Sequence, residues 1–397
     1  MALELKNEVL NSMINLLLQH KAELISVNEH DMIGADNSDV ALYDRLRIDE
    51  KKFKGMIQSL SDTIGKKDPV GIERYHYQHG QGLKIVNRSA PFGTILIIYE
   101  SRPDVTIEAA ALAFKAGSKI LLKGGKEARN SNLFLVSLWQ QALMENNLKT
   151  DLIQYLDYSR EQTNDLLRSS KKKIDLIVPR GGDGLIEMVK SLASAPVLVS
   201  GRGNNFIYVH EDADLDKSVE IIYNSKLNKI SVCNATDKVL FNKNLPDYQS
   251  FIKRVSQKLI DSECEVMADS TFSKISMIGI PINDDENILY EEFLSKKIMF
   301  SLVDSLDEAI GVINKYSGGH TAVILTEDNF SAAKFMEEVD AASVIHNASS
   351  RYTDGGQFGL GAELAISTDK LHHRGPLGLD HLVTNKWYVY GDGQIRE

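Results

Sequence analysis

The chain has only two cysteines, Cys233 and Cys264, among 397 residues. A secreted protein held together by disulfides would carry more of them, so we expect a reducing compartment. No apolar run approaches the roughly 20 residues that span a bilayer. The first residues also lack the basic and apolar regions of a signal peptide. The sequence therefore predicts a cytoplasmic protein without a membrane segment.

An excess of basic residues is also missing. Asp and Glu outnumber Lys and Arg by 55 to 45, which gives a formal net charge of −10. A nucleic-acid-binding surface needs a clear basic excess, so no nucleic-acid partner is expected. Hydrophobic residues (43%) and charged residues (25%) occur in the proportions of an ordinary soluble globular protein. A chain of this length predicts two or three domains.

The first 65 residues or so predict helices, because Leu10, Ile14 and Leu17 begin a series of apolar residues at helical spacing. Residues 75–86 then combine two glycines with polar and aromatic residues, which predicts an extended hairpin. This hairpin has little apolar mass of its own. It should therefore pack against another element or another subunit.

From residue 94 onward, short apolar runs alternate with amphipathic stretches. Residues 94–99 predict a strand buried on both faces, and residues 105–115 predict the helix that follows. The alternation continues to about residue 371 and includes a strand predicted at residues 277–280. This pattern indicates an α/β fold with parallel sheets, whose ligands bind at the carboxyl ends of the strands.

Two glycine-rich loops follow predicted strands. Residues 123–126 read Lys-Gly-Gly-Lys, and residues 179–184 read Pro-Arg-Gly-Gly-Asp-Gly before a predicted helix. A glycine-rich entry to a helix N-terminus favours anions. Neither loop has the GxGxxG pattern, so a simple turn is the alternative for each. A third segment, residues 347–361, is rich in glycine and hydroxyl side chains and has the character of a binding loop.

Cys233 lies in the short polar connection Ser-Val-Cys-Asn-Ala at residues 231–235. A thiolate attacks electrophilic carbon, and nucleophiles commonly sit on loops that rigid elements hold in place. A small buried apolar residue is the alternative role for a lone cysteine. Cys264 stands between Glu263 and Glu265, and acidic neighbours raise the pKa of a thiol. We therefore expect Cys264 to be inert.

Several long motifs together resemble one family. They are Tyr-Glu-Ser-Arg-Pro-Asp-Val-Thr at residues 99–106, the cysteine segment 231–235, the glycine-rich segment 347–361, and the segments 371–378 and 391–396. In these segments the chain closely resembles the gamma-glutamyl phosphate reductases of the aldehyde dehydrogenase superfamily. The likeness extends from about residue 43 to the C-terminus.

The resemblance implies an α/β, aldehyde dehydrogenase-like fold. A Rossmann-like parallel-sheet cofactor domain would comprise residues 1–70 and 91–204, and an α/β catalytic domain residues 205–375. A small oligomerisation hairpin would comprise residues 71–90, joined by residues 376–397. The family organisation also implies a homo-oligomer, a dimer or larger.

The resemblance carries site residues onto matching positions. Cys233 matches the family nucleophile, and Lys123, Gly181 and Gly182 match positions that contact the cofactor phosphates. Glu292 matches the glutamate that holds the nicotinamide ribose in the wider superfamily. The expected cofactor is NADPH, and no metal ligand set is expected.

The remaining candidates follow from the charges of the substrate. The oxyanion needs donors, and Asn234 beside the cysteine is one candidate together with the backbone amide. Arg102 and Arg351 could hold a phosphate or a carboxylate through forked contacts, and Asp354 could meet an ammonium group. A structural ion pair at the surface is the alternative for each arginine.

The implied reaction is the NADPH-dependent reduction of L-glutamyl 5-phosphate to L-glutamate 5-semialdehyde, the second step of proline biosynthesis from glutamate. Aldehyde-oxidising relatives need an acid that activates water, but residues 199–203 offer none. The family expectation extends to contact with the upstream glutamate 5-kinase. Two alternatives stay open: an aldehyde dehydrogenase of other specificity, and a weakly active paralogue that acts as a binding partner. The second alternative is based on Asp183 and residues 229–230, where the family usually has Lys and Arg-Pro. Asp104, where the family usually has Asn, is a further departure from the family pattern.

Overall fold

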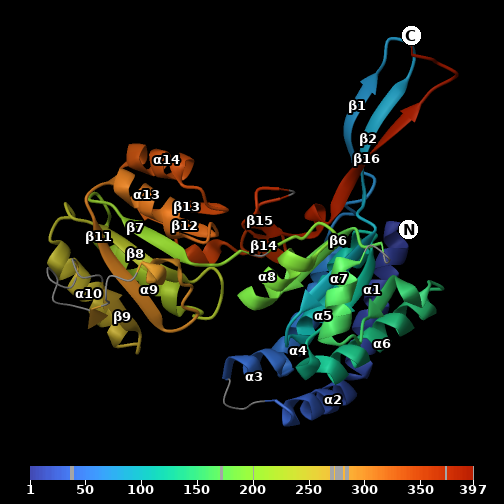
Figure 1. Cartoon of the computed structure of the whole chain (residues 1–397), viewed down its shortest axis with the longest axis horizontal. Coiled ribbons are helices and arrows are strands. Elements are labelled where there is room, and N and C mark those ends of the chain that lie inside the picture. The colour runs from blue at the N-terminus through green and yellow to red at the C-terminus, as the bar shows by residue number, and fades with distance from the viewer. Residues whose placement is uncertain are drawn as a thin grey trace. The chain divides into compact units, whose positions relative to one another are not determined.

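The computed structural model describes residues 1–35, 40–169, 173–199, 201–268, 272, 280–281, 286–371 and 373–396. The chain divides into two compact units. Unit 1 comprises residues 1–199, 360–365 and 377–397, and unit 2 comprises residues 200–359 and 366–376. Each unit has a parallel sheet of its own, coloured blue to green in unit 1 and green to orange in unit 2 (Figure 1).

Unit 1 begins with four helices and continues as alternating strands and helices. Its parallel sheet has the strand order β5-β4-β3-β6. The elements are α1 (Leu3–Gln19), α2 (Lys21–Ile33), α3 (Val40–Leu46), α4 (Glu50–Gly65), β3 (Thr94–Tyr99), α5 (Pro103–Lys115), β4 (Lys119–Lys123), α6 (Arg129–Glu145), β5 (Ile153–Tyr155), α7 (Arg160–Arg168), β6 (Leu176–Arg180) and α8 (Asp183–Leu192).

Both faces of this sheet are covered by helices. Ile95 and Ile97 of β3 belong to the core that includes α1, α4, α5 and α6, whereas Leu96 and Ile98 belong to the core formed with α7 and α8. Alternate residues of a strand point to opposite faces, so an unbroken apolar run suits a strand that is buried on both sides. The sequence prediction for residues 94–99 is confirmed as β3.

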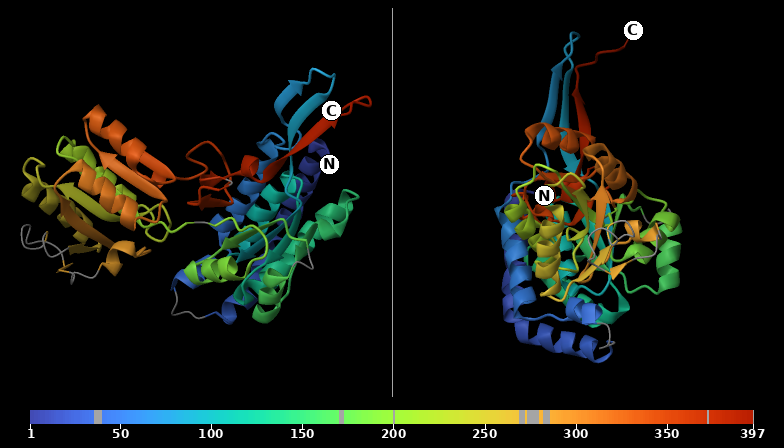
Figure 2. Two further views of the ribbon diagram at one scale, coloured as in Figure 1. Left: turned by 45° about the horizontal axis from the view of Figure 1, so that its top comes forward. Right: turned by 90° about the vertical axis from the view of Figure 1, so that its left-hand side faces the viewer.

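A separate three-stranded antiparallel sheet completes unit 1. It consists of β1 (Glu73–Gln78), β2 (Lys84–Pro91) and β16 (Val383–Tyr390), with β2 in the middle. Figure 2 shows this sheet projecting beyond the helices of its unit. The predicted hairpin is therefore confirmed, and it does pack against another element, β16.

Unit 2 contains a seven-stranded parallel sheet of order β10-β9-β11-β8-β7-β12-β13. Helices α9 and α10 cover one face, and α13 and α14 cover the other. The elements are β7 (Asn205–Val209), α9 (Leu215–Leu227), β8 (Thr236–Asn242), α10 (Tyr248–Ile260), β9 (Glu265–Ala268), β10 (Ile280–Pro281), α12 (Asn287–Tyr290), β11 (Lys297–Val303), α13 (Leu306–Tyr316), β12 (Thr321–Leu325), α14 (Asn329–Glu338) and β13 (Ser343–His346).

The remaining strands, β14 (Ala365–Ser367) and β15 (Gly375–Leu377), pair with each other near the points where the chain passes between the units. The strand predicted at residues 277–280 lies outside the described residues except for its last position. Among the helices that the structure describes, none has both the length and the apolar character needed to cross a membrane.

Candidate active site

Cys233 is a half-buried thiol in the turn between α9 and β8. Asn205, the first residue of β7, donates from Nδ2 to the carbonyl oxygens of Cys233 and Ala235, both at 2.7 Å. Its Oδ1 accepts the backbone amide of Thr321, the first residue of β12, at 3.0 Å. One buried asparagine thus ties the cysteine turn to two neighbouring strands. The predicted nucleophile therefore sits on a rigid support.

Gly203 lies in contact with both the cysteine turn and Glu292. A Cβ at position 203 would come within 2.5 Å of Glu292 Oε1 and closer still to the Cys233 carbonyl oxygen, whereas Cβ atoms keep at least 3.0 Å from such neighbours. Only glycine allows this approach of two backbones. The structure therefore brings together two residues that the sequence assigned to the site, the nucleophile and the proposed ribose carboxylate.

Asn234 fastens the cysteine turn to the glycine-rich segment. Its Nδ2 donates to the carbonyl oxygens of Thr353 at 2.8 Å and Arg351 at 3.5 Å. In return, the Ser350 hydroxyl donates to the Asn234 carbonyl oxygen at 2.6 Å. Both donors of the side-chain amide are thus directed at main-chain oxygens. These contacts fix the turn, and a role for Asn234 in binding the oxyanion stays a prediction.

Arg351 and Asp354 lie on the segment that Asn234 holds. Burial lowers the pKa of the Arg351 guanidinium, while Asp354 and the thiolate of Cys233 raise it. The attraction is mutual, so the guanidinium favours the thiolate form of the cysteine. Arg351 Nε also donates to Asn228 Oδ1 at 3.3 Å, and Asp354 Oδ1 accepts the Gln357 amide at 3.1 Å. Two predicted substrate residues therefore stand in the electrostatic neighbourhood of the nucleophile.

Cys264 has a different environment. It is buried in the apolar core beneath α10, and burial raises its pKa to about 11. The acidic neighbour Glu265 adds to the shift, but less than burial does. A buried protonated thiol is a poor nucleophile. The contrast with Cys233 agrees with the expectation that Cys264 is inert.

Unit 1 contains a cavity of about 440 Å³ at the carboxyl ends of its strands. The lining includes Tyr99 at the end of β3, Lys123 at the end of β4, Arg160 at the start of α7 and Gly184 in α8. Burial lowers the pKa of Lys123, and its Nζ donates to the Gly124 carbonyl oxygen at 2.6 Å. The cavity lies where the topology of a parallel sheet predicts a ligand site.

The glycine loop between β6 and α8 already holds an anion from the protein. The amide of Gly182, the N-cap of α8, donates to Glu100 Oε2 at 3.0 Å. A Cβ at Gly181 would come within 2.8 Å of the same carboxylate. The sequence predicts that this loop binds an anion, and in the structure the anion that it binds is the Glu100 carboxylate. The side chain of Asp183, which begins α8, lies outside the described part of the chain.

Arg102 lies at the start of α5 in unit 1, and its guanidinium forms a 2.8 Å ion pair with Asp104. The second carboxylate oxygen of Asp104 is buried and has no hydrogen-bond partner among the described residues. Glu108 follows one helical turn later. Burial and then repulsion by Asp104 raise the pKa of Glu108 to about 7, against attraction by Arg102 and Arg180. The unusual Asp104 therefore engages Arg102 and perturbs a neighbouring carboxyl.

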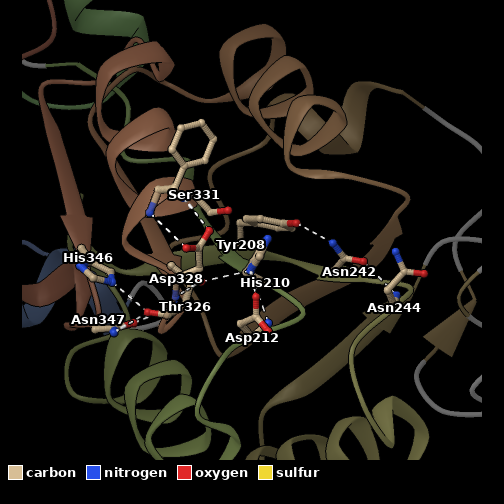
Figure 3. Close-up of polar contacts among 11 residues, drawn as sticks. Tyr208, His210, Asp212, Asn242, Asn244, Thr326, Asp328, Ser331, His346 and Asn347 are labelled. Atoms are coloured by element: carbon tan, nitrogen blue, oxygen red, sulfur yellow. Dashed lines mark hydrogen bonds and ion pairs between the residues drawn. The ribbon is translucent and has the colours of Figure 1, made fainter.

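A network of polar side chains, which includes His210, Asp212 and Thr326, lies at the carboxyl edge of the unit 2 sheet (Figure 3). His210, Glu211 and Asp212 are also close enough together to be considered as metal ligands. Residues 210–212 each bring one possible ligand atom within 4.8 Å of the others. However, His210 Nδ1 already contacts the Thr326 hydroxyl at 3.1 Å and the Asp212 amide at 3.4 Å. Thr326 in turn exchanges hydrogen bonds with Asn347. These contacts connect the ends of strands β7, β12 and β13 and give His210 Nδ1 partners within the protein.

Sequence reasoning missed several residues that shape these sites. Gly203 and Asn205 have no local signal, because their partners are distant in sequence. Arg160 could have been found, since Ser159 and Gln162 form a capping box that places a basic residue at the start of a helix after a strand. A basic side chain at such a position commonly faces the ligand site of a parallel sheet.

Comparison with known proteins identifies the family. Residues 1–272 match the model of the aldehyde dehydrogenase family. A gamma-glutamyl phosphate reductase of Dictyoglomus thermophilum is 39% identical over 99% of this chain and 94% of its own length. The crystal structure of gamma-glutamyl phosphate reductase from Thermotoga maritima is 38% identical, with a TM-score of 0.94 over 100% of this chain and 95% of that one. An engineered glycolyl-CoA reductase with bound NADP+ shares the fold at 17% identity, with a TM-score of 0.69 over 98% of this chain and 92% of that one. This chain therefore belongs to the gamma-glutamyl phosphate reductases, oxidoreductases of the aldehyde dehydrogenase family that use a nicotinamide cofactor.

Proposed function

We propose that this chain reduces L-glutamyl 5-phosphate to L-glutamate 5-semialdehyde and phosphate, with Cys233 as the nucleophile and NADPH as the reductant. This is the second step of proline biosynthesis from glutamate. The observation that carries the proposal is the arrangement around Cys233. A rigid turn holds the thiol, Arg351 favours its ionised form, and Glu292 is packed against the same glycine, Gly203.

The first chemical step belongs to the cysteine. The Cys233 thiolate attacks the gamma-carbonyl carbon of the acyl phosphate, the bond to the phosphate oxygen breaks, and a thioester forms as phosphate leaves. Developing charge on the carbonyl oxygen calls for nearby donors, for which the Cys233 backbone amide and Asn234 are the candidates. Because Asn234 already donates to main-chain oxygens, its contacts support the backbone amide as the main donor.

The thioester is then reduced. A nicotinamide cofactor bound here would supply the hydride that reduces the thioester to the aldehyde, with Cys233 as the leaving thiolate. Residues 199–203 contain no carboxylate that could activate water against the thioester. At these residues the chain lacks the acid that aldehyde-oxidising relatives use to activate water, so hydride rather than water is proposed to take the acyl group. Glu292 is proposed to hold the nicotinamide ribose.

The substrate's charged ends need partners of opposite sign. Arg351 is proposed to bind the phosphate or the alpha-carboxylate, and Asp354 the alpha-ammonium group, because both lie on the segment fastened to the cysteine turn. Arg102 of unit 1 is a further proposed contact, and its ion pair with Asp104 would have to loosen first. Arg102→Ala should raise KM for the substrate and leave KM for the cofactor unchanged.

A preference for NADPH over NADH is supported by the cavity of unit 1. Lys123, Lys126 and Arg160 line it, and a 2′-phosphate needs such cations. The glycine loop at Gly181 and Gly182 is proposed to meet the cofactor pyrophosphate in exchange for the Glu100 carboxylate. Arg160→Ala should raise KM for NADPH about tenfold or more and leave KM for NADH nearly unchanged. Arg168→Ala, at the far end of α7, is the matched control and should change neither.

The three-stranded sheet is proposed to form an oligomer interface. Tyr75, Tyr77, Trp387 and Val389 are about half exposed, and their pairing through β2 places them on one face. Tyr75 and Trp387 also contact each other, with ring centroids 5.6 Å apart. An apolar face of this kind suits a second copy of the chain. The remaining domain roles are proposed for the ranges expected from sequence, cofactor binding at residues 1–70 and 91–204 and catalysis at residues 205–375. The compact units differ from these ranges, because residues 200–204 belong to unit 2 and residues 360–365 to unit 1. A cytoplasmic location and a contact with glutamate 5-kinase rest on sequence and resemblance alone.

The decisive assay is the reverse reaction, the phosphate-dependent oxidation of glutamate 5-semialdehyde with NADP+. An aldehyde dehydrogenase of other specificity would not require phosphate, so activity without phosphate would refute the proposal. Complementation of a proline auxotroph separates the enzyme from an inactive paralogue, with Cys233→Ser as the control. Rescue by the intact chain alone is expected. Rescue by both proteins would remove Cys233 from the mechanism.

A further inference from the structure

A buried ionic cluster lies beside the cysteine turn, and the proposed chemistry does not use it. Lys226 and Asp237 form a 2.9 Å ion pair in which both side chains are almost wholly buried. Lys238, the next residue of β8, is 1% exposed. Removing three charged groups from water costs several kcal/mol per ion unless each finds well-placed partners. The groups that Lys226, Asp237 and Lys238 contact are therefore the ones that the cluster holds in place.

The cluster contacts Glu291 and Phe293, the two residues on either side of Glu292. Lys238 Nζ donates to the carbonyl oxygen of Glu291, and the ammonium lies 4.3 Å from the ring centroid of Phe293. On the other side, Asp237 Oδ2 accepts the backbone amide of Phe293 at 3.3 Å. The main chain is thus fixed immediately before and immediately after the proposed ribose carboxylate.

A β-bulge makes this convergence of neighbouring side chains possible. Consecutive residues of β7 pair with Thr236 and Lys238, so Asp237 is an extra residue in β8. In a regular strand, adjacent side chains point to opposite faces, and only one of the two could reach the same segment. Bulges re-aim side chains and are common next to active sites. Here the bulge allows both Asp237 and Lys238 to contact Phe293.

Asn204 extends the same scaffold to the cysteine turn. Its Oδ1 accepts a hydrogen bond from Lys238, while its Nδ2 donates to the carbonyl oxygens of Leu289 and Tyr316, both at 2.7 Å. The preceding residue, Gly203, contacts both the cysteine turn and the proposed ribose carboxylate. The Lys238 ammonium group therefore connects the segment of Gly203 and Asn204, which contacts the cysteine turn, to the segment that carries Glu292.

We propose that Lys238 is a positioning residue that sets the place of the Glu292 carboxylate relative to the Cys233 sulfur. Through this placement it controls how tightly the nicotinamide ribose is bound. The inference rests on the proposed function, in which Glu292 binds that ribose. A neutral side chain of similar length could neither donate to Asn204 and Glu291 together nor attract an aromatic ring as a cation does.

The charge of Lys238 should change within a measurable pH range. Burial lowers its pKa to about 8, with repulsion from Lys226 adding to the effect and attraction from Asp237, Glu291 and Glu292 opposing it. Lys238 is therefore protonated at neutral pH and loses its proton as the pH rises through about 8. A neutral amine keeps two N–H donors but loses the charge that attracts the Phe293 ring and strengthens both hydrogen bonds. The segment around Glu292 is then held less tightly, so KM for the cofactor should increase in that range.

The test measures kcat and KM for NADP+ in the phosphate-dependent oxidation of glutamate 5-semialdehyde, between about pH 6.5 and 9.5. At pH 7, Lys238→Met should raise KM about tenfold, whereas kcat at saturating cofactor should stay within about threefold of the wild type. The KM of Lys238→Met should no longer depend on pH. Lys238→Arg keeps its charge throughout this range, so it should hold a low KM even at pH 9.5.

Lys115→Met is the matched control, because Lys115 is also buried and donates to an asparagine, Asn7, and to a main-chain carbonyl, that of Ile64, within unit 1. It should lower the melting temperature without changing KM. An unchanged KM in folded Lys238→Met, or an equal rise in Lys115→Met, would overturn the proposal. If Lys238→Met does not fold, a wild-type KM that stays flat across the pH range overturns it instead. A wild-type protein without phosphate-dependent activity would refute the proposed function rather than this inference.

Discussion

Replacing Gly203 with alanine tests whether the close packing of one glycine sets the geometry of the active site. The added methyl would come within 2.5 Å of Glu292 Oε1 and nearer still to the Cys233 carbonyl oxygen, although Cβ atoms keep at least 3.0 Å from such neighbours. Asn205 holds that carbonyl from the other side. The cysteine turn must therefore shift by about 1 Å, and a displacement of that size can cost about 100-fold in rate.

We expect kcat/KM for the phosphate-dependent oxidation of glutamate 5-semialdehyde to fall about 100-fold in Gly203→Ala. This loss corresponds to about 2.7 kcal/mol of transition-state stabilisation. The absorbance of the reduced cofactor measures the rate, and circular dichroism with thermal unfolding shows whether the fold persists. Gly311→Ala in α13 is the control, because outside its own helix no atom of the described residues lies within 4 Å of the added methyl. It should keep full activity and unfold at a slightly higher temperature, since alanine favours a helix by about 1 kcal/mol over glycine.

A folded Gly203→Ala protein with kcat/KM within about threefold of the wild type would refute this reasoning. It would mean that the cysteine turn and the Glu292 segment can separate without loss of function. The proposed coupling between the nucleophile and the ribose carboxylate would then have no structural basis.

Three further predictions follow from the charges and the exposed surfaces. Iodoacetamide at pH 8 should alkylate Cys233 much faster than Cys264, because burial raises the pKa of Cys264 to about 11; equal labelling in mass spectrometry would contradict this. The folded state raises the pKa of Glu108 to about 7, so folding favours the protonated form of this carboxyl. The free energy of unfolding that depends on this proton is therefore fully present below about pH 4.5 and is lost as the pH rises through 7. Glu108→Gln should therefore be more stable than the wild type at pH 8.5, by on the order of 2 kcal/mol, and equally stable at pH 4; thermal unfolding at both pH values measures this. Trp387→Lys should lower the molar mass found by analytical ultracentrifugation, since it places a charge on the exposed apolar face of the three-stranded sheet, and an unchanged mass would exclude that face as the interface.

Local patterning predicted much of the fold. The apolar run at residues 94–99 became β3, and the helix predicted at residues 105–115 lies in α5. The helical spacing in the first 65 residues likewise became four helices. These elements are predictable because the spacing of apolar residues follows directly from the period of a helix or a strand.

The site was predictable only in part. The motif around Cys233 indicated the nucleophile, yet its neighbour Asn234 was expected to face the substrate oxyanion. In the structure its amide donors are directed at the carbonyl oxygens of Arg351 and Thr353. Sequence adjacency to a nucleophile does not say where a side chain points, because the partners of a buried amide come from distant segments.

The sequence by itself determined the family and the alternation that forms two parallel sheets, and it led us to propose Cys233 as the reactive thiol. The tertiary structure decided how that thiol is held. Gly203 has no room for a side chain because two backbones meet at it, and a bulge at Asp237 turns the side chains of Asp237 and Lys238 toward one segment. Periodicity along the chain is a local property, whereas close approach and strand register depend on residues far apart in sequence, so only the folded chain specifies them.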